Sequence, residues 1–191
     1  MVIISVATYV NNIKIKFMCG LIGTIGFKDD SKLNIRSLSH RGPDAIGQWD
    51  SLNGEFPVVL GHTRLAILDL TEAANQPLLS RDGRYVLVFN GEIYNFIELR
   101  LELESLGQVF YTKSDTEVFL KGLILEGPSF QLRCNGMWSF CLWDRKKKTA
   151  LFGRDRFGKK PLFYHLLSKN RLAFASEMKG INPFLNSIQP N

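Results

Sequence analysis

The alternation of apolar and polar positions predicts several β-strands. Residues 19–27 (CGLIGTIGF) alternate with a period of two, which is typical of a strand. The continuous apolar run at residues 85–90 (YVLVFN) predicts a strand buried on both faces. Shorter apolar segments predict separate strands at residues 58–60 and 65–70, on either side of GHTR. Adjacent Gly and Pro predict a loop at residues 39–47 (SHRGPDAIG).

Two helices are predicted after these strands. Leucines recur at helical spacing through residues 99–106, and Gly107 is placed to end that helix. Ser114 and Glu117 have the spacing of a capping box, which predicts the start of a second helix. The side chains expected on the apolar faces are Leu99, Leu103 and Leu106 for the first helix, and Val118, Phe119 and Leu123 for the second.

The C-terminal part of the chain predicts hairpins. Residues 137–144, 149–155, 160–167 and 171–177 are strand-like, and the polar segments RKKK and SKNR join them. Strands and helices do not alternate regularly, so a parallel sheet of βαβ units is not favoured. The pattern predicts an α+β fold with two mainly antiparallel sheets in layers and helices packed outside them.

Composition narrows the class of protein. The chain has 191 residues, 45% of them hydrophobic and 22% charged, which suits one folded domain with a real core. The net charge is +6, but the one dense basic run, residues 145–148, is predicted to be a hairpin turn, so we expect no nucleic-acid partner. We also expect no membrane partner: no apolar run is long enough to span a bilayer, and residues 2–10 lack the flanks of a secretion signal.

Three cysteines are candidates for chemistry. Their spacing fits neither a disulfide framework nor a metal site, which predicts a reducing, cytoplasmic location and no bound metal. Cys134 and Cys141 are expected to be core residues. Cys19 follows Met18, and if the chain began at Cys19, its own α-amine could act as the base that activates the thiol. The alternative for Cys19 is a buried strand cysteine.

Nine segments occur in an order that carries a family resemblance. Together they are similar to the glutamine-hydrolysing, class II amidotransferase domain of asparagine synthetase, over residues 18 to about 181. That resemblance implies the four-layer αββα sandwich of the N-terminal-nucleophile hydrolases and hydrolysis of L-glutamine to glutamate and ammonia. The segments are MCGLIGTIGF, HRGPD, GHTRLAILDL, QPL, FNGEIYNFIELR, SDTEV, GMWSFCLWD, GRDRFGKKPLFY and FASEMKGI.

The resemblance also implies roles for single residues. Cys19 matches the nucleophile that forms a γ-glutamyl thioester, and Asn90 and Gly91 match the oxyanion hole. Arg64 matches the residue that holds the glutamine α-carboxylate, and Asp115 the one that meets its α-amine. Further residues expected to line the glutamine pocket are Leu65, Ala66, Ile67, Leu68 and Glu92.

The residues taken singly leave simpler interpretations open. Asn90-Gly91 would be a plain turn, Arg64 a surface strand residue, Asp115 a second helix cap and Glu92 a solvated charge. The apolar residues of the predicted pocket would be core packing. The segments HRGPD and GRDRFGKKPLFY are assigned no chemistry. The forms GHTRLAILDL and NGEIYN favour the asparagine synthetase branch over other class II amidotransferases.

The chain departs from the family pattern in three places. Residues 1–17 precede Met18 and are expected to be a mis-assigned start or a propeptide, and residues 18–191 form the amidotransferase domain. A family helix is expected to be short, at about two or three turns, between residues 28 and 39. The sequence has no SGGLDSS-like loop, so ATP and Mg are expected only in a missing synthetase domain or partner subunit. That domain or subunit would receive the ammonia and use it to make asparagine from aspartate. The rival interpretation is a truncated, catalytically silent module that binds glutamine or a partner.

Overall fold

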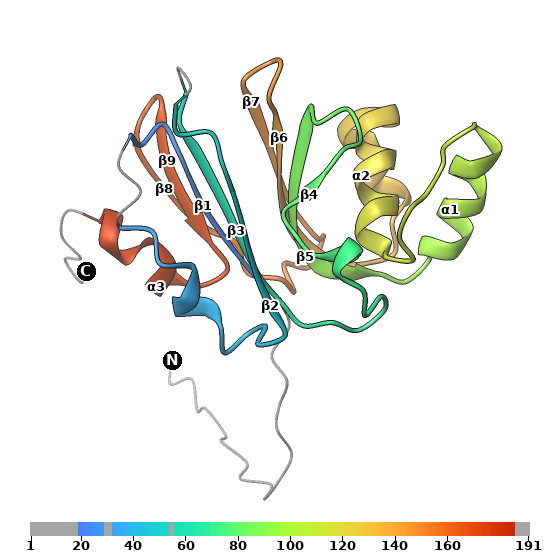
Figure 1. The fold of residues 1–191 in the computed structure, drawn as a ribbon, viewed down its shortest axis with the longest axis horizontal. Coiled ribbons are helices and arrows are strands. Elements are labelled where there is room, and N and C mark those ends of the chain that lie inside the picture. Colours follow the sequence, from blue (N-terminus) through green and yellow to red (C-terminus); the bar gives the residue numbers. More distant parts are fainter. Residues whose placement is uncertain (1–18, 29–31, 54–55, 186–191) are drawn as a thin grey trace, which may run out of the picture.

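One antiparallel sheet of five strands begins the fold. The computed structural model describes residues 19–28, 32–53 and 56–185; Met18 and the extension predicted at residues 1–17 lie outside them. The strand order in this sheet is β2-β3-β1-β9-β8 (Figure 1), which places the first strand at its centre. The strands are β1 (Gly20–Ile25), β2 (Ala45–Asp50), β3 (Val58–Arg64), β8 (Phe163–Ser168) and β9 (Arg171–Ala175).

A second antiparallel sheet has the order β4-β5-β6-β7. Its strands are β4 (Leu78–Leu79), β5 (Tyr85–Ile93), β6 (Gly136–Asp144) and β7 (Thr149–Arg154). Helices α1 (Phe96–Ser105) and α2 (Asp115–Glu126) cover the outer face of this sheet, and α3 (Met178–Ile181) lies outside the first sheet (Figure 1). Short 3-10 helices complete the described residues: η1 (Ile35–Leu38), η2 (Glu72–Ala74), η3 (Gly127–Arg133) and η4 (Asn182–Phe184).

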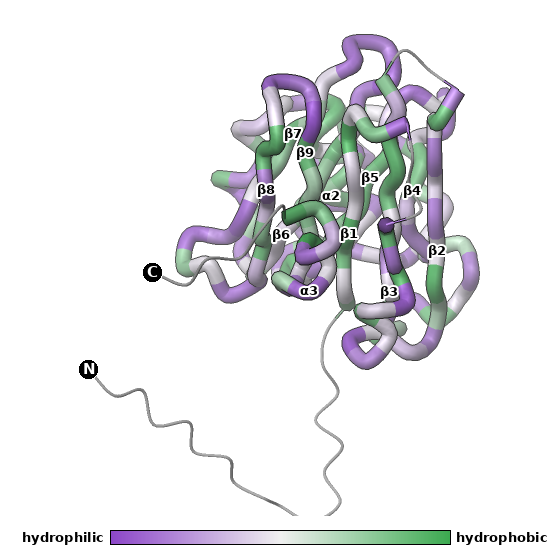
Figure 2. The backbone as a smooth tube through the Cα atoms, turned by 90° about the vertical axis from the view of Figure 1, so that its left-hand side faces the viewer, coloured by the Kyte–Doolittle hydropathy of each residue, from purple (hydrophilic) through white to green (hydrophobic). Residues whose placement is uncertain are grey.

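Three hydrophobic clusters separate four layers. Leu60, Val88 and Phe174 belong to the cluster between the two sheets. Phe119 belongs to a second cluster, between α1, α2 and the four-stranded sheet. The third packs η1, α3 and η4 against the five-stranded sheet. These layers confirm the predicted α+β sandwich, and Figure 2 shows apolar positions along β1, β5 and β9 with hydrophilic positions in the connecting loops.

Helix α2 is fixed by the aromatic side chains beneath it. The Phe119 ring lies 5.1 Å from the Phe89 ring of β5 and 5.0 Å from the Phe140 ring of β6. Burying a phenylalanine stabilises a fold by roughly 1.5–3 kcal/mol. At its start, Ser114 Oγ accepts the Glu117 N–H at 3.3 Å, as the capping pattern predicts. The Glu117 carboxylate accepts backbone N–H groups of Tyr111 and Thr112, so the start of α2 is held in one position.

Some predicted elements are wrong. Residues 58–64 form one strand that includes GHTR, and residues 65–70 are a loop instead of a second strand. Residues 45–47, the end of the predicted loop, belong instead to strand β2; a Cβ at Gly47 would lie 2.0 Å from the Gln76 carbonyl oxygen, so this Gly marks a close chain crossing.

Two helix predictions also need correction. Leu106 is 62% exposed, because α1 ends at Ser105 and Gly107 follows with a φ of +84°. Between residues 32 and 39 the structure has only the 3-10 helix η1, in place of the helix of two or three turns expected there.

Candidate functional site

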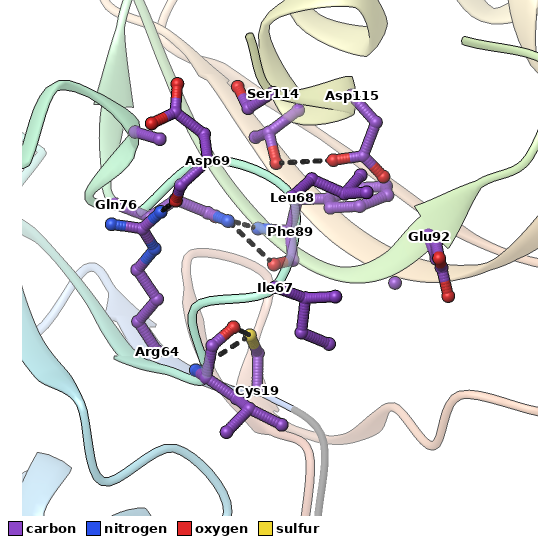
Figure 3. Close-up of a pocket in the computed structure, with 14 residues that line it drawn as sticks. Cys19, Arg64, Ile67, Leu68, Asp69, Gln76, Phe89, Glu92, Ser114 and Asp115 are labelled. Carbon is purple, nitrogen blue, oxygen red and sulfur yellow. Dashed lines mark hydrogen bonds between the residues drawn. The ribbon is translucent and has the colours of Figure 1, made fainter. Parts of the chain in front are cut away.

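Cys19 lies immediately before β1, at one end of a pocket (Figure 3). Its Sγ accepts the Leu65 N–H at 3.3 Å and lies 3.6 Å from the Leu65 carbonyl oxygen. Burial raises the pKa of the Cys19 thiol above its ordinary value. The thiol is therefore held in place but needs a base before it can act as a thiolate.

A residue of the HRGPD segment holds the backbone of Cys19 in place. From the sequence, no chemistry was assigned to this segment. Arg41 Nε donates to the Cys19 carbonyl oxygen at 3.1 Å, and its Nη1 pairs with Glu177 at 2.9 Å. A Cβ at Gly20 would lie 3.3 Å from Arg41 Cδ and 2.7 Å from Thr63 Oγ1. A glycine after Cys19 thus leaves room for the arginine that holds its backbone.

The same segment shapes the pocket wall. Asp44 Oδ2 accepts the Ala66 N–H at 2.9 Å, and the Asp44 N–H donates to the Arg64 carbonyl oxygen at 3.0 Å. A Cβ at Gly42 would lie 2.4 Å from the Thr63 carbonyl oxygen, so this loop packs directly on the β3 backbone. The HRGPD segment therefore holds the loop after β3 in place through these hydrogen bonds and this close packing.

Arg64 is the last residue of β3. It is buried and lines the pocket. Its Nη1 donates to the Thr71 carbonyl oxygen at 2.8 Å and to Asn75 Oδ1 at 2.7 Å, and its Nη2 to the Asp69 carbonyl oxygen. A guanidinium has five N–H donors. Two of them have no acceptor among the described residues and are available to a ligand, so Arg64 is not the surface strand residue of the simpler interpretation.

Asp69 is a pocket residue that sequence reasoning missed. Its carboxylate accepts from the Thr71 hydroxyl at 2.7 Å and from the Lys113 N–H at 2.8 Å. These hydrogen bonds, the one from Thr71 foremost, lower the pKa of Asp69 to about 2. Asp69 ties the loop that holds Arg64 to the segment before α2; its only sequence signal was its place in GHTRLAILDL.

Asp115 is the first residue of α2 and is 6% exposed. Its Oδ2 accepts the Ile93 N–H at the end of β5, at 2.9 Å. Burial raises the pKa of Asp115 to about 6, and the nearby charge of Glu92 acts in the same direction. Ser114 is the cap of α2, so the Asp115 carboxylate faces the pocket as a buried charge that would gain from a cationic partner.

Asn90 and Gly91 lie within β5, paired with Ser139 and Trp138 of β6, so the plain-turn interpretation is wrong. A Cβ at Gly91 would lie 2.3 Å from the Met137 carbonyl oxygen, which explains the glycine. Gly91 and Glu92 line the pocket, whereas Asn90 is fully buried with its carboxamide against Ser176.

The pocket brings most of the expected residues together. Figure 3 shows Cys19 and Arg64 on one side and Glu92 and Asp115 across from them. Of the apolar loop, Leu65, Ile67 and Leu68 line the pocket, but Ala66 does not. Gln76, of the QPL segment, is a further lining residue, and its side-chain amide hydrogen-bonds both the N–H and the carbonyl of Phe89 at 2.6 and 3.1 Å.

The other titratable candidates take structural positions. His62 is fully buried with Nε2 3.0 Å from the Phe89 carbonyl oxygen, and burial lowers its pKa to about 4. Cys134 and Cys141 are buried in the core as expected, and burial raises the pKa of both thiols. Within the described residues no group of three His, Cys, Asp or Glu side chains could hold a metal ion. None of the helices described is long and apolar enough to cross a membrane.

Comparison with known proteins agrees with this geometry. A family model described as a glutamine amidotransferase domain matches residues 18–190. The chain belongs to this family. It is 39% identical to a putative asparagine synthetase [glutamine-hydrolyzing] 2 of Methanocaldococcus jannaschii, with 86% of this chain and 35% of the relative covered. It is 37% identical to asparagine synthetase B [glutamine-hydrolyzing] of Escherichia coli, with 90% of this chain and 31% of the relative covered.

The chain spans only about a third of the length of these relatives. Among solved structures, glutamine phosphoribosylpyrophosphate amidotransferase from B. subtilis, complexed with ADP and GMP, matches with a TM-score of 0.72 at 21% identity. That match covers 86% of this chain and 43% of the neighbour, and it supports the fold. The expected resemblance to the amidotransferase domain of asparagine synthetases is thus confirmed.

Proposed function

We propose that this domain hydrolyses the side-chain amide of L-glutamine to glutamate and ammonia, with Cys19 as nucleophile. The observation that carries the proposal is that Cys19, Arg64 and Asp115 line one pocket. Free glutamine carries a carboxylate and an ammonium at the same end. A guanidinium with two available N–H donors suits the carboxylate, and the buried Asp115 carboxylate suits the ammonium. The side-chain amide would then extend toward Cys19.

The reaction divides into two steps. The base accepts the Cys19 thiol proton, the thiolate attacks the amide carbon, and the C–N bond breaks as the protonated base returns that proton to the leaving nitrogen. Ammonia departs and a γ-glutamyl thioester remains; water then attacks the thioester carbon and frees glutamate and the thiol. The developing oxyanion would be stabilised by Asn90 and by the Gly91 N–H. The base would be the α-amine of Cys19, which titrates near ~7.7–8 when it is free. Because burial raises the pKa of the thiol, turnover depends on that base.

The proposed partners follow from the same chemistry. Ammonia would pass to a synthetase domain or subunit that converts aspartate to asparagine, in line with the asparagine synthetase names of the relatives. No cofactor takes part in the proposed glutaminase steps; ATP and Mg would belong to the synthetase part. The three cysteines are free, which is consistent with the cytoplasmic location expected from the sequence.

A second candidate is a glutamine-binding module without turnover. The raised pKa of the Cys19 thiol favours it for any form of the chain in which the Cys19 nitrogen is in a peptide bond. In that form the pocket would keep Arg64 and Asp115 and would still bind glutamine, but it would lack the base.

The test is a glutaminase assay on the chain prepared with Cys19 as its first residue. We expect ammonia and glutamate in equal amounts, no turnover by Cys19→Ala, and full turnover by Cys134→Ala, which removes a thiol buried in the core. A glutamine analogue that carries a chloroketone should label Cys19 alone, as peptide mapping would show. Turnover by Cys19→Ala equal to that of the wild type would rule out the proposed nucleophile.

A further inference from the structure

Ser176 connects the strand that follows Cys19 to the strand that carries Asn90. It is fully buried and follows the last residue of β9. Its N–H donates to the Leu21 carbonyl oxygen at 2.8 Å, and its Oγ accepts the Leu21 N–H at 3.0 Å. Its Oγ also lies 3.4 Å from Asn90 Nδ2. One hydroxyl therefore contacts both the strand that follows Cys19 and the side chain of Asn90.

The hydrogen bonds at this hydroxyl are unbalanced. Two N–H groups, from Leu21 and Asn90, point at Ser176 Oγ, while its own proton has no acceptor among the described residues. Asn90 Oδ1 is buried and has no hydrogen-bond partner among the described residues. A buried acceptor left without a donor destabilises the fold. The 3.4 Å contact is also long for an N–H···O bond, which is ordinarily about 2.7–3.2 Å.

Exchanging the two ends of the Asn90 amide satisfies both Oδ1 and the Ser176 proton, and the group left without a partner becomes a donor instead of an acceptor. The Ser176 O–H then donates to Asn90 Oδ1, while Oγ still accepts the Leu21 N–H. Asn90 Nδ2 takes the position where Oδ1 has no partner in the described part of the chain. Its N–H groups then have no acceptor among the described residues, which is what a donor reserved for a ligand oxygen requires. Oδ1 only accepts and Nδ2 only donates, so the hydrogen-bond network decides which way the amide points.

We propose that Ser176 is a positioning residue: its hydroxyl donates to Asn90 Oδ1 and so directs the Asn90 N–H toward the carbonyl oxygen of the reacting amide. This inference rests on the proposed glutaminase function. Because the same hydroxyl accepts the Leu21 N–H, Ser176 sets the oxyanion donor in register with the strand that follows the nucleophile. Ser176 itself touches no reacting atom.

The experiment compares Ser176→Ala with Asn90→Ala and with the double variant, each with Cys19 as first residue. Loss of an oxyanion donor costs about 10²–10³ in rate, and we expect Ser176→Ala to lower kcat by roughly 10- to 100-fold with the KM for glutamine unchanged. The double variant should match Asn90→Ala alone, because the hydroxyl acts through Asn90. Thr24→Val is the matched control: it removes from β1 a second buried hydroxyl, which has no hydrogen-bond partner within the described ranges, and it should leave kcat unchanged.

Alkylation of Cys19 by iodoacetamide provides a second readout, because it needs no oxyanion donor. We expect Ser176→Ala to react at the wild-type rate. A slower alkylation together with losses that multiply in the double variant would show a merely structural role and overturn the inference. An unchanged kcat in Ser176→Ala, with an active wild type, overturns the inference alone. An inactive wild type overturns the proposed function and the inference together.

Discussion

Replacement of Asp115 by Asn tests whether the pocket holds a carboxylate at a cost to stability. Asp115 is buried and its pKa is raised to about 6 from an ordinary 3.8. Below pH 3.8 the folded and unfolded chains both hold the proton. Between these two values the unfolded chain releases it first, so the folded state loses stability as the pH rises.

The magnitude follows from the two pKa values. A tenfold change in an ionisation constant is worth about 1.4 kcal/mol, so the ionised Asp115 costs the fold about 3 kcal/mol at pH 7.5. Asn removes the charge and can still accept the Ile93 N–H through Oδ1. Its amide N–H adds a buried donor that costs about 1–2 kcal/mol. The net expectation is a gain of about 1–2 kcal/mol at pH 7.5, which becomes a loss of about 1 kcal/mol at pH 4, where the folded Asp115 is protonated and only the cost of the buried amide donor remains.

Urea unfolding of wild type and Asp115→Asn at pH 7.5 and pH 4 measures this difference. Asp69→Asn is the matched control with the opposite sign. Hydrogen bonds lower the pKa of Asp69 to about 2, so its charge contributes stability above pH 3.8, which is lost as the pH falls through 2. Asp69→Asn should therefore destabilise the protein at pH 7.5. A loss of stability in Asp115→Asn at pH 7.5 would refute the reasoning.

Three further predictions concern the reaction. The KM for glutamine should rise as the pH falls below about 6, because protonated Asp115 no longer attracts the α-ammonium; a flat KM between pH 5 and 8 would contradict this role. Gly91→Ala should lower both the free energy of unfolding and kcat, because its Cβ would meet the Met137 carbonyl oxygen at 2.3 Å; Gly107→Ala, with no atom within 4 Å of its Cβ, should lose some stability and no activity. Arg41→Met removes the donor to the Cys19 carbonyl and should lower kcat roughly tenfold in steady-state assays; a wild-type kcat in Arg41→Met would show that this anchor is dispensable.

Local patterns were sufficient for most elements of the fold. The two-residue alternation of β1, the capping pair of α2 and the charged turns between the C-terminal strands all depend on near neighbours, and the structure has them as predicted. The strand at residues 45–50 was missed because its Gly47 follows a loop signal in sequence, whereas its partner is β3 in space. The segment at 65–70 is apolar because it lines a pocket, which a period of two does not distinguish from a strand.

The candidate site likewise contains residues that the sequence identified and residues that only distant contacts reveal. Cys19, Arg64 and Asp115 could be named from the resemblance, but the residues that hold them could not. Arg41 reaches Cys19 across 22 positions of sequence, and Asp69 reaches Lys113 across 44. Such contacts depend on how the sheets and loops meet, and no local pattern predicts them.

The central claim is that the free α-amine of Cys19 is the base for glutamine hydrolysis. The most direct measurement compares kcat for the chain that begins at Cys19 with kcat for the chain that retains residues 1–18, under identical conditions. We predict turnover by the first and a rate at least about 10²-fold lower for the second, which lacks the base. Equal rates from the two chains would contradict the account.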